Sequence, residues 1–197
     1  MLTELQKRKL MKLFSMYDAC NLGVLKISDF ECLAERLGNI RGWATDSIPY
    51  ENITSKFIYL WNRIRSEIKK VYNSQPEILN NPDAWSTQIR TQITLEEWLT
   101  YFDVVLANHE YHQEILDLSD AIFTVVDSDQ SGHLDKSEWA DLFRVYNIPV
   151  IYVDETFSKI DLNGDGTLSN AEVMSMIEEF YFSSDPNKAG NYMFGPI

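Results

Sequence analysis

Two segments of twelve residues repeat one arrangement of oxygen-bearing side chains around a central glycine. DSDQSGHLDKSE spans residues 127–138, and DLNGDGTLSNAE spans residues 161–172. Each begins with Asp, has glycine at its sixth position and leucine at its eighth, and ends with Glu. This spacing wraps side-chain and carbonyl oxygens around one point, which suits a hard cation. The chain must therefore fold so that the two ends of each segment approach each other.

Both segments match the twelve-residue calcium loop of EF-hands at every informative position. Positions 1, 3, 5, 9 and 12 supply side-chain oxygens, and position 7 supplies its backbone carbonyl. His133 stands at position 7, so we expect no metal role for its imidazole. The predicted ligands are Asp127, Asp129, Ser131, His133, Asp135 and Glu138 in the first loop, and Asp161, Asn163, Asp165, Thr167, Ser169 and Glu172 in the second.

The number of carboxylates predicts a ranking of the two sites. The first loop has four carboxylates and the second has three, so the charge count favours tighter Ca²⁺ binding by the first. Asp135 at its ninth position would also admit Mg²⁺ as a competitor.

The helical period dominates the rest of the chain. Apolar residues recur at i, i+3, i+4 and i+7, as in Phe57, Leu60, Trp61 and Ile64, and strand-like alternation is confined to pieces such as GVLKI and TQITL. We therefore expect an all-α protein of about eight helices. The aromatic residues on these stripes are interpreted as core. Trp98 and Trp139 each follow a glutamate and should be the first buried residues of exiting helices.

The segment 18–29 has the outline of a third loop without its ligands. Gly23 and Leu25 occupy the sixth and eighth positions. The inner ligand positions hold a thiol, an isobutyl group and an ammonium, from Cys20, Leu22 and Lys26. A neutral thiol is a poor ligand for a hard cation. We interpret this loop as a structural frame that binds no metal.

A fourth loop, more distant from the template, fits residues 86–97. Glu97 precedes Trp98 as Glu138 precedes Trp139, and Ile93 takes the eighth position. Glycine is missing at Thr91, and Ser86, Gln88 and Arg90 stand at the first, third and fifth positions. We expect no metal there, and we expect this segment to pair with the loop 18–29. An ordinary helix–loop–helix remains an alternative for this segment.

With four loops laid out, the chain resembles the sarcoplasmic calcium-binding protein family, and within it the calexcitins. The likeness rests on MYDACNLGVLKISDFE, on TLEEWL, on the two intact loops and on the ending NKAGNYMFG. It implies four EF-hand units in two pairs that form one compact globule. Residues 1–108 would be a metal-free pair, residues 109–182 a calcium-binding pair and residues 183–197 a tail. The chain departs from the family at its first loop, where many members keep their ligands.

Charge and composition restrict the classes of binding partner that we expect. Residues 1–100 have a net charge of +1 and residues 101–197 a net charge of −14. An acidic surface is a poor partner for nucleic acid, and no apolar run approaches the ~20 residues of a membrane span. The two cysteines indicate free thiols in the cytosol. We expect a cytoplasmic, monomeric, non-enzymatic calcium buffer or sensor; a sensor would also have a protein target.

Two further hypotheses concern apolar residues. Tyr192, Met193, Phe194 and Ile197 could fold back over an apolar groove, the alternative being a frayed tail. The chain could also carry an apolar small molecule, because the similar coelenterazine-binding proteins and photoproteins hold one in an aromatic-lined cavity. The candidate lining residues are Trp43, Tyr59, Trp61, Trp98 and His109.

Overall fold

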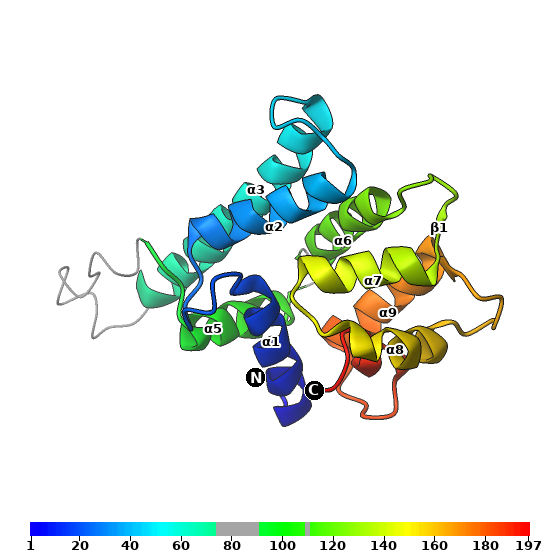
Figure 1. Cartoon of the computed structure of the whole chain (residues 1–197). Coiled ribbons are helices and arrows are strands. Elements are labelled where there is room, and N and C mark those ends of the chain that lie inside the picture. Colours follow the sequence, from blue (N-terminus) through cyan, green and yellow to red (C-terminus); the bar gives the residue numbers. More distant parts are fainter. Residues whose placement is uncertain (74–90, 109–110) are drawn as a thin grey trace.

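The structure is a computed structural model that describes residues 1–73, 91–108 and 111–197. These residues are mostly helical (Figure 1), which confirms the predicted all-α class. Their α-helices are α1 (Glu4–Tyr17), α2 (Ile27–Ile40), α3 (Ile48–Asn73), α5 (Leu95–Val105), α6 (His112–Val126), α7 (Lys136–Val145), α8 (Val153–Ile160) and α9 (Asn170–Phe182).

The helices that leave the loops start on residues of the loops themselves. In α5, α7 and α9 the N-cap side chain accepts a hydrogen bond from the backbone three residues on, and the glutamate there accepts one from the N-cap N–H. These residues are the ninth and twelfth positions of the loops, so each loop contains the capping box that starts its exiting helix. The pairs are Thr94 with Glu97, Asp135 with Glu138, and Ser169 with Glu172.

The loops meet in pairs through the aliphatic residues at their eighth positions. Leu134 and Leu168 stand opposite each other where β1 (His133–Leu134) pairs with β2 (Leu168–Ser169) in antiparallel fashion. Leu25 and Ile93 form an antiparallel bridge with two N–H···O bonds of 2.8 Å. All four side chains are at most 1% exposed. The predicted pairing of the loop 18–29 with the segment at Ile93 is therefore confirmed.

One continuous hydrophobic core joins all the helices. Trp98 and Trp139 are buried at the starts of α5 and α7, as predicted. Each indole N–H has an acceptor: the Leu10 carbonyl at 2.9 Å for Trp98, and Thr156 Oγ1 at 3.1 Å for Trp139. The core thus buries the large rings without leaving a polar N–H unpaired.

The C-terminal tail folds back onto the helices. After a 3₁₀ helix at Ala189–Tyr192, Met193 is 1% and Phe194 is 5% exposed, whereas Tyr192 is 40% and Ile197 is 36% exposed. The ring of Phe194 lies 5.0 Å, between centroids, from that of Phe180. The fold-back prediction is confirmed for Met193 and Phe194 and wrong for the other two, because only the middle of the apolar tip reaches the core.

A buried lysine ties this tail to the first helix. Lys9 on α1 is 1% exposed, and its Nζ donates to the Glu179 carbonyl at 3.2 Å, the Ser183 carbonyl at 2.7 Å and Asn191 Oδ1 at 3.1 Å. Burial lowers the pKa of Lys9 to about 8, because the charged form loses its water. The cation remains in place at neutral pH and holds the end of α9 and the tail against α1.

Some expectations are wrong or lie outside the described residues. The spacing of Val150, Val153, Phe157 and Ile160 predicts one apolar stripe, but Val150 lies in a 3₁₀ turn and is 48% exposed. The segment 73–87, which its proline and asparagine residues predict to be a loop, lies outside the described residues from position 74 onward. Positions 86–90 of the fourth loop and His109 lie outside them as well. Over 1–73, 91–108 and 111–197, no helix combines the length and apolar character that crossing a membrane requires.

The contact between Trp139 and Thr156 gives a stability prediction. Thr156→Val keeps the shape but leaves the buried indole N–H without an acceptor, which should lower the free energy of unfolding by about 1–3 kcal/mol. Urea denaturation followed by tryptophan fluorescence measures it. The control is Thr124→Val on the exposed face of α6, which should change stability by less than about 0.5 kcal/mol. Equal effects of the two variants would contradict the assignment.

Candidate metal centres and the central cavity

The first loop begins where α6 ends and closes in the first turn of α7. Asp127 follows the last residue of α6, and Glu138 is the third residue of α7. The loop turns sharply at Gln130 and Gly132, which have φ of 60° and 81°. Glycine suits this left-handed backbone because it has no Cβ to clash. The turn brings the first and last acidic residues of the loop together.

Three carboxylates converge in this loop. Asp127, Asp129 and Glu138 each offer one oxygen such that all three atoms lie within 4.8 Å of one another. In the part of the chain that the structure describes, no other group of three or more His, Cys, Asp or Glu side chains gathers as closely. Asp127 and Glu138 are each 7% exposed. Like charges this close repel one another, and a divalent cation between them would remove the repulsion.

Backbone amides hold these carboxylates in place. Asp127 accepts from the N–H groups of Ser131 and Gly132 at 3.0 and 2.9 Å. Glu138 accepts from Ser128 N at 2.7 Å and from Asp135 N at 3.0 Å, so it spans the loop from end to end. A hydrogen bond from the Ser131 N–H lowers the pKa of Asp129, which favours the charged form that a cation needs.

The second loop has the same kind of backbone hydrogen bonds to its first aspartate, but its carboxylates do not gather as closely. Asp161 accepts from Gly164 N at 2.8 Å and Gly166 N at 3.0 Å, and a hydrogen bond from the Thr167 N–H lowers the pKa of Asp165. Among the residues that the structure describes, the Glu172 carboxylate accepts hydrogen bonds from Ser169 alone, from its N–H and its hydroxyl. Glu138 also bonds to the start of its loop, at Ser128, whereas Glu172 has no such bond among the described residues. Its carboxylate therefore does not gather with those of Asp161 and Asp165.

Two further predicted ligand side chains, those of Ser131 and Asn163, bond within their own loops. Ser131 Oγ donates to the His133 carbonyl at 2.9 Å, and Asn163 Nδ2 donates to Asp165 Oδ2 at 3.0 Å. The imidazole Nδ1 of His133 lies 3.2 Å from the Ser131 carbonyl, at the exposed rim.

In the loop 18–29, the carboxylates of Asp18 and Asp29 accept hydrogen bonds from backbone N–H groups of the same loop. Asp18 accepts from Leu22 N and Gly23 N at 2.8 and 2.7 Å. Asp29 is fully buried and accepts from Cys20 N at 3.2 Å and Lys26 N at 2.7 Å. The loop therefore keeps the frame of a calcium loop with backbone N–H groups as the partners of both acids.

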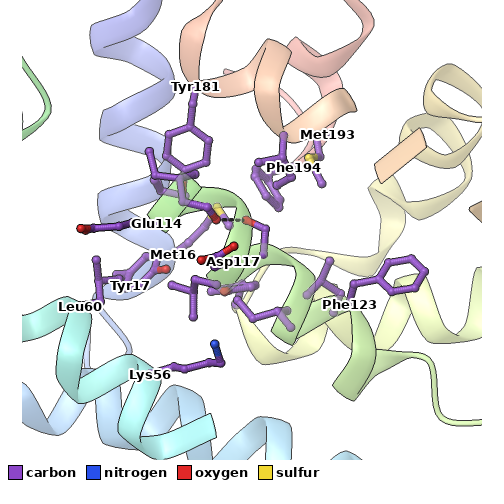
Figure 2. A pocket seen from close by; sticks show the side chains of 18 of the residues that line it. Met16, Tyr17, Lys56, Leu60, Glu114, Asp117, Phe123, Tyr181, Met193 and Phe194 are labelled. Atoms are coloured by element: carbon purple, nitrogen blue, oxygen red, sulfur yellow. Dashed lines mark hydrogen bonds between the residues drawn. The ribbon is translucent and has the colours of Figure 1, made fainter. Parts of the chain in front are cut away.

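A large apolar cavity lies between the helices. Its volume is about 580 Å³, and its walls come from α1, α3, α5, α6, α7, α9 and the tail. Figure 2 shows Tyr17, Leu60, Phe123, Tyr181 and Phe194 arranged around it. The sequence suggested such a cavity only as one hypothesis, and most of its lining residues were not predicted because they lie far apart in the chain.

The predicted lining residues are partly correct. Tyr59 and Trp98 line the cavity, whereas Trp43 and Trp61 do not. Trp61 instead packs on Phe30 with ring centroids 5.4 Å apart, inside the core of the first hand. Val126, Leu134 and Trp139 also line the cavity, and they precede, lie within and follow the loop 127–138. The cavity wall and the first candidate metal centre therefore share a stretch of backbone.

Comparisons with known proteins agree with this geometry. The family model of an EF-hand domain pair matches residues 117–178. Mitrocomin of Mitrocoma cellularia is 29% identical over 102 residues, 50% of this chain and 52% of that protein, so the match spans about half its length. Sarcoplasmic calcium-binding protein 1 of Astacus leptodactylus is 25% identical over 189 residues, 92% of this chain and 91% of that protein.

Solved structures show the same fold. The calcium-loaded apo form of the coelenterazine-binding protein from Renilla muelleri has a TM-score of 0.66 at 17% identity, and each chain covers 100% of the other. The sarcoplasmic calcium-binding protein from amphioxus has a TM-score of 0.69 at 16% identity, again with complete coverage of both chains. The narrower likeness to calexcitins stays a prediction. Residues 117–178 thus match an EF-hand domain pair, and the chain is similar to one sarcoplasmic calcium-binding protein in sequence and to another in fold.

Proposed function

We propose that this protein binds two calcium ions, one in the loop 127–138 and one in the loop 161–172, as a monomeric cytosolic buffer or sensor without enzymatic activity. The convergence of Asp127, Asp129 and Glu138 within 4.8 Å carries the proposal. Ca²⁺ takes six to eight oxygen ligands, and the twelve residues predicted from the sequence would supply them. Mg²⁺ would compete at the first site, where Asp135 adds a fourth carboxylate.

The same proposal assigns different roles to the two parts of the chain. Residues 1–108 would form a metal-free pair of hands, because Cys20, Leu22 and Lys26 replace the oxygen ligands at the inner positions of the loop 18–29. Residues 109–182 would form the calcium-binding pair, and residues 183–197 the tail. Supporting it, the net charge is +1 over residues 1–100 and −14 over residues 101–197, and an acidic surface attracts divalent cations.

Calorimetric titration with calcium tests the proposal. The wild-type protein should bind two ions, and Glu138→Gln or Glu172→Gln should each weaken one site by about 100-fold, since each removes a bidentate carboxylate. The site of Glu138 should be the tighter one, because its carboxylates are already gathered. The control is Glu31→Gln on the exposed face of α2, which should bind as the wild type does.

Stoichiometries of zero or four would contradict the proposal. Repeating the titration in Mg²⁺ should lower the apparent calcium affinity of the Glu138 site more than that of the Glu172 site. Equal calcium affinities of the two sites in the wild-type protein would contradict the ranking alone.

The cavity supports a second candidate function, that of a carrier for an apolar small molecule. A volume of about 580 Å³ lies within the ~300–1,000 Å³ of ligand pockets. Its walls are mostly apolar and aromatic, with a few polar groups such as Lys56, Glu114 and Asp117 on the side of α3 and α6 (Figure 2). The Renilla protein of the same fold is named for binding coelenterazine.

Filling the cavity tests the carrier function. The wild-type protein should bind the apolar dye ANS and coelenterazine, whereas Leu118→Trp should lower both affinities by about tenfold, because the indole would occupy the space. Fluorescence titration measures this. Ile48→Trp, at a position that is 72% exposed on α3, is the control and should bind normally. Equal binding by both variants, or none by the wild type, would contradict the carrier function.

A further inference from the structure

Cations from the first part of the chain cap helix ends in the calcium-binding part. The last carbonyls of an α-helix lack partners within the helix and carry the negative end of its dipole. Arg41 reaches the end of α6, Arg36 the end of α7 and Lys9 the end of α9. These are three of the four helices that flank the two candidate calcium loops. The fourth, α8, has Lys159 in its own last turn.

Arg41 contacts the point where α6 becomes the loop 127–138. Its Nη1 donates to the Asp127 carbonyl at 2.7 Å and lies 3.4 Å from the carbonyls of Thr124 and Val125. The last turn of α6 has no basic residue of its own, so this guanidinium is its cation. The guanidinium carbon also lies 5.7 Å from the centroid of the Trp43 ring. The first residue of the calcium loop is thus fixed from the other half of the chain.

Arg36 contacts the other helix of the same hand. Its Nη1 donates to the carbonyl of Val145, the last residue of α7, at 2.8 Å, and its Nη2 lies 3.4 Å from the Ala19 carbonyl. Ala19 belongs to the metal-free loop 18–29. One side chain therefore joins the metal-free loop to the helix that leaves the candidate calcium loop.

Both arginines come from the end of one helix. Arg36 lies in α2, and Arg41 is its C-cap; α2 packs against α3 on one side and also against α6 and α7 (Figure 1). A single rigid helix therefore holds both arms of the hand that contains the loop 127–138. Calcium opens the hands of EF-hand sensors by changing the angle between such arms. Contacts that fix both arms restrict that angle.

We propose that Arg36 and Arg41 form an interhalf clamp that pre-organises the loop 127–138 and so raises its affinity for calcium. This inference rests on the proposed calcium binding. With the clamp in place, the carboxylates of Asp127, Asp129 and Glu138 are already gathered. Because the loop is already ordered, calcium binding costs less conformational entropy. This lower cost raises the affinity. The metal-free half regulates the calcium site by holding it.

Electrostatics alone predicts the opposite sign. The guanidinium of Arg41 is a positive charge beside the first residue of the loop, and it repels a cation. Its removal would then strengthen calcium binding. The clamp predicts weaker binding after the same substitution, because the two arms and the loop gain freedom. The sign of the change in affinity separates the two effects.

The experiment uses the full chain with Glu172→Gln, so that only the first site titrates. Adding Arg36→Met and Arg41→Met should lower the calcium affinity of that site by about tenfold, within the range of allosteric couplings. Methionine keeps the apolar stem but removes the charge and the donors. Arg8→Met, at an exposed position of α1, removes one positive charge without touching the clamp and is the control. It should leave the affinity unchanged or raise it slightly.

Hydrogen exchange gives an independent readout. Linkage requires that calcium strengthen the clamp as the clamp strengthens calcium binding, so calcium should slow exchange at the end of α2 in the parent chain but not in the double variant. If the double variant does not fold, Arg41→Met alone should still weaken binding about threefold. Unchanged or tighter binding in the clamp variants overturns the clamp. A parent chain that binds no calcium at the first site overturns the proposed function itself.

Discussion

The structure depends on one hydrogen-bond arrangement that recurs in the three loops described in full. The first residue is an aspartate whose two oxygens accept backbone N–H groups from the middle of its own loop: Leu22 and Gly23 for Asp18, Ser131 and Gly132 for Asp127, Gly164 and Gly166 for Asp161. This bond set bends each loop without a cation. Metal ligands at the other positions can then be lost while the loop, its pairing and the helices beside it persist.

Sequence reasoning succeeded where the information is local. The helical period, the glycine turns and the capping glutamates act within a few residues, so the all-α class and the positions of the loops could be predicted. The pairing of Leu25 with Ile93 was also predictable, because eighth positions of EF-hand loops meet in pairs and only two loops lacked a partner. The ligand positions follow from the same template, and calcium binding at each of them stays a prediction.

The predictions that were wrong or missing concern contacts between residues far apart in the chain. Trp43 and Trp61 are aromatic residues of the kind that line cavities. Trp43, in the segment between α2 and α3, instead lies beside Arg41, and Trp61 on α3 packs on Phe30. The contact of Arg41 with Asp127 joins residues 86 positions apart, and no pattern within either segment indicates it. Only the middle of the apolar tail is buried, because Lys9 and Asn191 fix where the chain turns back. Each of these depends on the packing of one half against the other.

Residues 1–108 therefore have a physical role that the loops 18–29 and 86–97 alone do not reveal. Residues 101–197 have a net charge of −14, so their carboxylates repel one another. The negative ends of three helices in this part add to the negative electrostatic potential. Three cations from residues 9–41 lie at those ends, one of them buried with its pKa lowered to about 8. The loop 18–29 is closed by hydrogen bonds from its own backbone N–H groups to Asp18 and Asp29. If residues 109–182 bind calcium as proposed, residues 1–108 would be the support against which they respond.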